Sequence, residues 1–100
     1  MSEKTIYKED TITDYKTPKM YRVVFLNDDY TTMDFVVEVL MSIFNKNPLE
    51  ATQIMLDVHQ KGKGIVGTYT YDIAKTKIAQ VEQVSKKRDF PLVSIMEPEY

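Results

Sequence analysis

The chain has 100 residues, 43% of them hydrophobic, and a formal net charge of -2 at pH 7. This length allows one small domain with a modest core, and the mixed charge argues against nucleic acid as the main partner. The absence of cysteine excludes disulfides and thiolate metal sites, and no apolar run approaches the roughly 20 residues that cross a bilayer.

Residues 1–19 alternate charged residues with Thr, Tyr and Ile and show no sustained hydrophobic period. Because they carry little apolar surface to offset the entropy of ordering, we expect a flexible N-terminal arm. The arm lacks the apolar core of a secretory signal, which predicts a cytoplasmic protein with no membrane partner. This pattern fits both an ordinary flexible terminus and a segment that a partner protein binds.

A buried strand is predicted over Met20–Leu26, where six of seven residues are apolar or aromatic. It is followed by Asn27, Asp28 and Asp29, which have two interpretations. Such residues are common in polar turns. They also form a compact group of acceptors suited to a cationic ligand with several N–H donors.

Two helices should come next and form a hairpin. Thr31 is predicted to cap the first, over about 32–45, with Asp34 at the capping-box position. Asn47 is predicted to cap the second, with Pro48 at the first helical position and a glycine end at Gly62. The first helix is apolar over more of its circumference than one core contact requires, which fits either a second core layer or the wall of a groove.

A second strand over 65–70, a third helix starting after Thr70 and a last strand over 91–96 complete the chain. The order strand, helix, helix, strand, helix, strand predicts an α+β domain over 20–97, followed by a short tail over 98–100. We expect a small three-stranded antiparallel sheet with three helices packed on it.

The sequence offers little material for catalysis. One histidine and no cysteine exclude common zinc sites, and Asn27-Asp28-Asp29 lacks the spacing of a calcium loop. No phosphate-binding loop and no nucleophile elbow is present. We therefore expect no enzyme activity, no metal and no cofactor.

His59 shares one side of the second helix with Met55 and Val58. A single histidine of this kind is more often a packing residue. If that side meets Met33 and Val36 of the first helix, however, an apolar pocket forms with acceptors at its mouth. Such a pocket would select a ligand with one apolar and one cationic end.

Two stretches, Val23–Val36 and Ala51–Gly64, resemble the ClpS family of adaptor proteins, and the similarity extends over about Tyr21–Met96. The family is non-enzymatic and delivers substrates that begin with Leu, Phe, Tyr or Trp to a Clp AAA+ unfoldase (ClpA- or ClpC-like) and its protease. The resemblance implies that the substrate's α-amino group is bound by Asn27, Asp28 and His59, with Thr31 near the peptide backbone. It further implies a pocket for the first side chain made by Met33, Val36, Met55, Val58 and Leu92.

The resemblance also implies that Met33 disfavours substrates whose first residue is branched at Cβ. Asp72 and Lys77 match positions that contact the N-terminal domain of the unfoldase, and the arm matches a segment engaged during hand-off. We expect a monomer. The alternative is a non-degradative interaction module like the C-terminal domain of the ribosomal stalk protein, in which Asn27-Asp28-Asp29 is a turn and Met33 is core.

Overall fold

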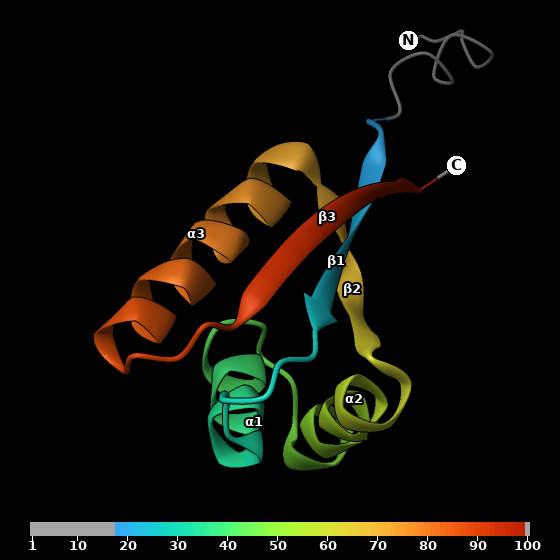
Figure 1. The fold of residues 1–100 in the computed structure, drawn as a ribbon. Helices are drawn as coiled ribbons and strands as arrows, with labels where there is room; N and C mark the ends of the chain where they lie inside the picture. The colour runs from blue at the N-terminus through green and yellow to red at the C-terminus, as the bar shows by residue number, and fades with distance from the viewer. Residues whose placement is uncertain (1–17, 100) are drawn as a thin grey trace, which may run out of the picture.

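The computed structural model describes residues 18–99, and the elements follow in the predicted order (Figure 1). The three strands form one antiparallel sheet, which confirms the α+β class. Most of the expected N-terminal arm, residues 1–17, lies outside the described residues. Within 18–99, no helix has the length and hydropathy needed to span a membrane. The elements are β1 (Met20–Leu26), α1 (Met33–Ser42), α2 (Pro48–Lys61), β2 (Lys63–Thr70), α3 (Tyr71–Lys87) and β3 (Val93–Glu99).

The sheet has the order β2-β1-β3, so the first strand in the chain is the central one. Its register shifts between Val23 and Val24, which lie opposite Gly67 and Ile65, so Val66 is the extra residue of a β-bulge on β2. Gly67 directly follows this extra residue, and glycine inside a strand often marks such an irregularity.

The last strand is longer than expected. Pro98 and Glu99, assigned to a tail from the sequence, pair with Tyr21 and Met20 of β1. In the sheet order β2-β1-β3, β3 is an edge strand and has no neighbour on its outer side. Pro98, which has no N–H, therefore removes no hydrogen bond to another strand on that side.

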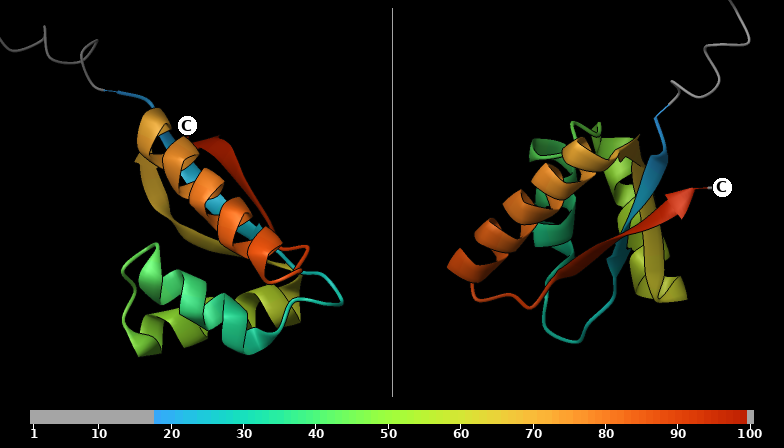
Figure 2. Two further views of the ribbon diagram at one scale, coloured as in Figure 1. Left: turned by 90° about the vertical axis from the view of Figure 1, so that its left-hand side faces the viewer. Right: turned by 90° about the horizontal axis from the view of Figure 1, so that it is seen from above.

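The helices occupy two places around the sheet. Helix α3 packs against all three strands and runs along one face, whereas α1 and α2 lie side by side at the end where β1 stops (Figures 1 and 2). Between them lies the core, which includes Val23 and Phe25 of β1, Phe35 and Leu40 of α1, and Val81 of α3. The loop after β1 is thereby placed against the helical hairpin.

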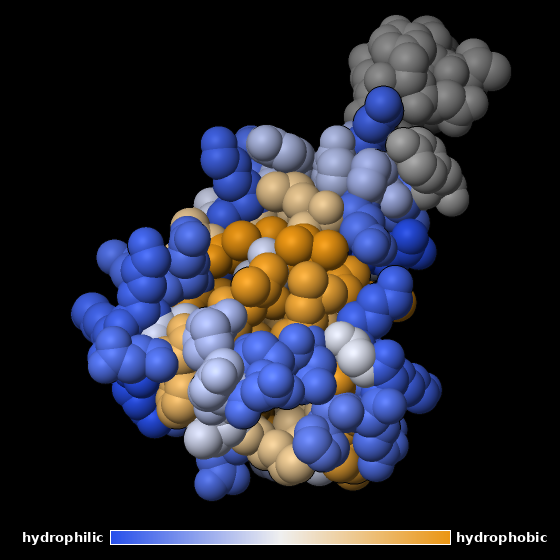
Figure 3. All heavy atoms as spheres, in the orientation of Figure 1, coloured by the Kyte–Doolittle hydropathy of each residue, from blue (hydrophilic) through white to orange (hydrophobic). Residues whose placement is uncertain are grey.

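The other face of the sheet is also apolar. Val24 is fully buried there between its cross-strand partners Ile65 and Ile95. Ile65 and Val93 remain exposed. Figure 3 shows hydrophobic residues gathered around β3 in the middle of the side facing the viewer.

Helix α1 begins one residue later than predicted. Its N-cap is Thr32, whose hydroxyl oxygen accepts the Phe35 N–H at 3.2 Å. Thr31 cannot take this role because its N–H and hydroxyl both bond the Asp28 carboxylate. The helix ends at Ser42 rather than near 45, because Asn45 takes a left-handed conformation with φ 56°.

Helix α2 begins as predicted. The Asn47 side chain accepts the Glu50 N–H at 2.8 Å, and the Glu50 carboxylate accepts the Asn47 N–H at 3.3 Å. Pro48 occupies the first helical position, and Gly62 ends the helix with φ 90°. The local pattern of the sequence sufficed here because every partner lies within four residues.

Candidate functional site

The loop 27–32 joins the end of β1 to the start of α1 and is tied to α2 at its first residue. The Asn27 N–H donates to the Gly62 carbonyl at 2.9 Å, just after the last turn of α2. His59 lies on that last turn. The end of the central strand is therefore fixed beside the histidine.

Asp28 shapes the rest of this loop. Its Oδ1 accepts the N–H groups of Tyr30 at 2.8 Å and Thr31 at 2.7 Å, and its Oδ2 accepts the Thr31 hydroxyl at 2.7 Å. Partial burial raises the pKa of Asp28, but the bonds from Thr31 and Tyr30 together outweigh it, so the pKa lies below its usual 3.8. An ionised carboxylate has about four acceptor sites, so Oδ2 keeps one for a ligand.

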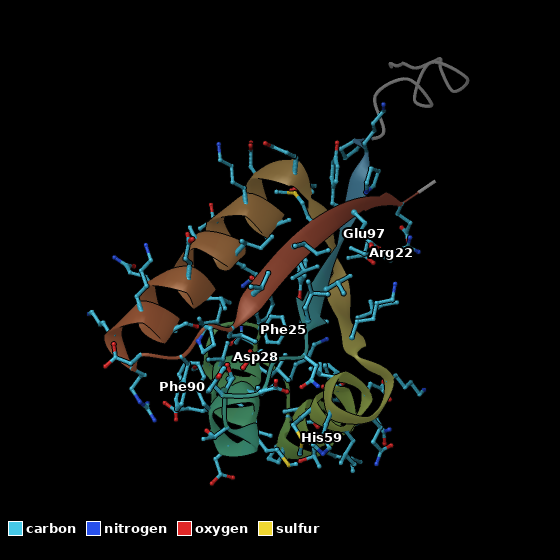
Figure 4. All side chains as sticks on the ribbon, in the orientation of Figure 1. Arg22, Phe25, Asp28, His59, Phe90 and Glu97 are labelled. Carbon is cyan, nitrogen blue, oxygen red and sulfur yellow. The ribbon has the colours of Figure 1, made fainter. Side chains whose placement is uncertain are left out.

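A cavity of about 450 Å³ lies between this loop, the start of α1 and the second half of α2. Figure 4 shows Asp28 on the loop and His59 on α2, at the same end of the molecule. The cavity is lined by Asn27, Asp28, Asp29, Tyr30, Thr31, Thr32, Met33, Val36, Met55, Val58 and His59.

The cavity has an apolar floor and a polar rim. Val36 and Val58 are 5% and 4% exposed, and Met55 is half-buried beside them. Met33 is 44% exposed at the helix start, which places it at the mouth. The rest of the rim is rich in oxygen acceptors, and no lysine or arginine lines this cavity among the described residues. The site therefore favours a ligand with a cationic group attached to an apolar one.

The same residues do not form a metal centre. Within 18–99, no group of three or more His, Cys, Asp or Glu side chains is placed to hold a metal ion. Of the residues that the structure describes, one histidine and two carboxylates line the cavity.

Leu92, which the resemblance placed in the pocket, does not line this cavity. It is buried in the main core, and the cavity that it lines is a separate one of about 120 Å³ between α3 and β3. The same core cluster includes Val36 and Val58, which line the cavity beside α1 and α2.

The two predicted unfoldase contacts lie elsewhere, on α3. Asp72 and Lys77 line a shallow groove of about 270 Å³ together with Ile73, Thr76 and Gln80. Asp72 lies one turn before Thr76 and Ile73 one turn before Lys77, so the groove follows one side of the helix.

Asp29, Tyr30 and Thr32 line the cavity but were not among the predicted site residues. The sequence predicts Asp29 only as part of the acceptor cluster. The signal that could have found all three is continuity, because a loop that contributes Asn27, Asp28 and Thr31 to one wall must pass through the residues between and beside them.

Comparisons with known proteins agree on one family. Residues 16–95 match the family described as ATP-dependent Clp protease adaptor protein ClpS. The chain is 65% identical over 99 residues to an ATP-dependent Clp protease adapter protein ClpS of Acetivibrio thermocellus, covering 99% of this chain and 100% of the relative. It is 61% identical over 75 residues to a protein of the same description from Syntrophus aciditrophicus, covering 75% of this chain and 70% of the relative.

A solved structure is also similar. Agrobacterium tumefaciens ClpS2 bound to L-phenylalaninamide matches with a TM-score of 0.80 and 37% sequence identity, over 83% of this chain and 100% of the other. The bound molecule in that structure has one free amino group and one aromatic side chain.

Proposed function

The chain belongs to the ClpS family of Clp protease adaptor proteins, and we propose that its cavity binds the first residue of a protein to be degraded. Membership makes it a non-catalytic adaptor rather than an enzyme, and it removes the reason for the ribosomal-stalk alternative. The observation that carries the proposal is the combination of an apolar floor and a rim of acceptors in one cavity. An N-terminal residue with a large side chain has the matching chemistry.

The free α-amino group would bind at the rim. Asp28 supplies the charge and one open acceptor site, and the Asn27 side chain and a ring nitrogen of His59 supply further acceptors directly or through water. Charge-assisted bonds of this kind contribute roughly 1.5–3 kcal/mol each. A substrate without the positive amine would lose most of this energy.

The first side chain, Leu, Phe, Tyr or Trp, would enter the apolar part between Met33, Val36, Met55 and Val58. Burying such a side chain contributes about 1.5–3 kcal/mol. With the amine bonds, this brings micromolar binding, about -8 kcal/mol, within reach after entropy costs. Met33 at the mouth would clash with a branch at Cβ, and Thr31 would lie near the peptide backbone.

Delivery requires a second surface. We assign the α3 groove, with Asp72 and Lys77, to the N-terminal domain of a ClpA- or ClpC-like unfoldase. In this proposal the protein acts in the cytoplasm as a monomer, and residues 1–19 are an arm that the unfoldase engages. The groove and the cavity have no lining residue in common, so both could be occupied together.

Fluorescent peptides that differ only at their first residue test the proposal. A peptide that begins with Leu or Phe should bind, its N-acetylated form should bind at least about tenfold more weakly, and one beginning with Ser should not compete. Equal affinity for the free and acetylated forms would contradict the proposed function.

A further inference from the structure

The Lys77 side chain is engaged inside the fold. Its ammonium donates to the Ile43 carbonyl at 2.8 Å, although the two residues are 34 positions apart. It also lies 5.5 Å from the ring centre of Phe44 and 5.9 Å from that of Tyr69. Lys77 is half-buried, so these contacts are partly shielded from water.

The partner of this bond is the end of α1. Ile43 is the C-cap of that helix, where carbonyl groups lack partners within the helix and the dipole is negative. The last turn of α1 has no basic residue of its own. Lys77, on α3, supplies the positive charge and the hydrogen-bond donor that the last turn of α1 lacks.

Helix α3 contacts α1 at a second place. The Arg88 guanidinium lies 5.1 Å from the ring centre of Phe35, and its Nη1 is 3.5 Å from Glu38 Oε2. Phe35 lies in the first turn of α1 and Glu38 near its middle, and Lys77 holds its end. Lys77 of α3 and Arg88, the C-cap of α3, thus contact one short helix along its length.

The position of α1 matters for the cavity, because Met33 and Val36 belong to its first turn and form the mouth and part of the floor. Without the bond from Lys77 to Ile43, the C-terminal end of α1 would be free to move, and a rotation of the helix would displace its first turn. We propose that Lys77 is a positioning residue that, through Ile43, keeps the mouth of the cavity narrow and so sets selectivity against β-branched first residues. This inference rests on the proposed function and gives Lys77 a role besides unfoldase contact.

The test compares the full chain with Lys77→Met, Lys77→Arg and the control Lys86→Met, which removes one charge from an exposed position of the same helix. Affinities are measured for peptides that begin with Leu and with Ile. Lys77→Met should reduce the Leu-over-Ile preference by about twofold to tenfold. Lys77→Arg should restore it, because a guanidinium can also donate to the carbonyl and stack on the rings. The control should resemble wild type.

Amide hydrogen exchange tests the hold on α1 without any ligand. The Ile43 N–H, bonded to Val39, and the Lys46 N–H, bonded to Leu40, should exchange faster in Lys77→Met than in Lys86→Met. An unchanged Leu-over-Ile preference in Lys77→Met, or exchange no faster than in the control, would overturn the inference. Failure of wild type to bind Leu-first peptides would instead refute the proposed function, and it would leave the exchange result to decide whether Lys77 holds α1.

Discussion

Replacing Asp28 with asparagine separates the charge of this residue from its role in the loop. The Asn oxygen can still accept the two N–H groups now bonded to Oδ1, and the Thr31 hydroxyl can accept from the new amide. The negative charge facing the amine is lost. Such a bond contributes roughly 1.5–3 kcal/mol, or about 10- to 150-fold in affinity. Because Asp28 is only partly buried, we expect the lower part of this range, about 10- to 30-fold.

Fluorescence polarisation with a Leu-first peptide measures this loss, and the acetylated peptide provides the internal comparison. Asp28→Asn should affect the free peptide far more than the acetylated one, which has no charge to lose. The matched control is Asp89→Asn, because Asp89 is exposed and has a φ of 59°, a conformation that asparagine also tolerates. Wild-type affinity in Asp28→Asn, or an equal loss in Asp89→Asn, would refute the assignment of the amine to Asp28.

Three further changes probe the site and its support. Met33→Ala should open the mouth of the cavity, so that peptides beginning with Ile or Val bind within about tenfold of Leu in the same assay; unchanged rejection would exclude Met33 as the gate. The lowered pKa of Asp28 means that its ionised form stabilises the fold above about pH 4 and that this contribution is lost as pH falls through the still lower folded value. Urea unfolding of wild type and Asp28→Asn should therefore converge in acid, and a constant difference down to about pH 3 would contradict this. Gly64→Ala would place a Cβ 2.8 Å from Val58 Cγ2 and 3.0 Å from the Ile54 carbonyl oxygen. It should therefore lower the free energy of unfolding by about 1–3 kcal/mol, measured by thermal unfolding, and weaken peptide binding. An unchanged melting temperature would show that α2 can shift to make room for the Cβ.

A last prediction concerns His59. His59→Ala should weaken binding of a Leu-first peptide by about twofold to tenfold, because it removes one acceptor from the rim of the cavity. His59→Gln keeps an acceptor oxygen and should lose less. Wild-type affinity in His59→Ala would mean that the imidazole does not bind the amine.

The fold could be predicted largely from local patterns. The strand over Met20–Leu26 and the capped start of α2 at Asn47 match the structure to the residue, because their determinants are neighbours in the chain. Two boundaries differed for different reasons. Thr31 lost its expected cap role because its hydroxyl donates to the Asp28 carboxylate, a competing local bond, whereas β3 extended to Glu99 because the distant strand β1 offers partners to its end.

The composition of the cavity was also visible early, because loop 27–32 and the Met55-Val58-His59 side of α2 carry the required acceptors and apolar groups. Leu92 shows the limit. Its residue type suited the pocket, and only the tertiary structure shows that it is buried in the core and lines a separate cavity between α3 and β3.

By itself, the sequence determined which segments become helices and strands and which residue types could meet a cationic, apolar ligand. Hydrophobic period, caps and turn residues act over a few positions, so they can be read without the fold. The tertiary structure alone decided that loop 27–32 lies against α2 and that Lys77 reaches Ile43 across 34 positions. Contacts of that kind depend on how whole elements pack, and no local pattern records them.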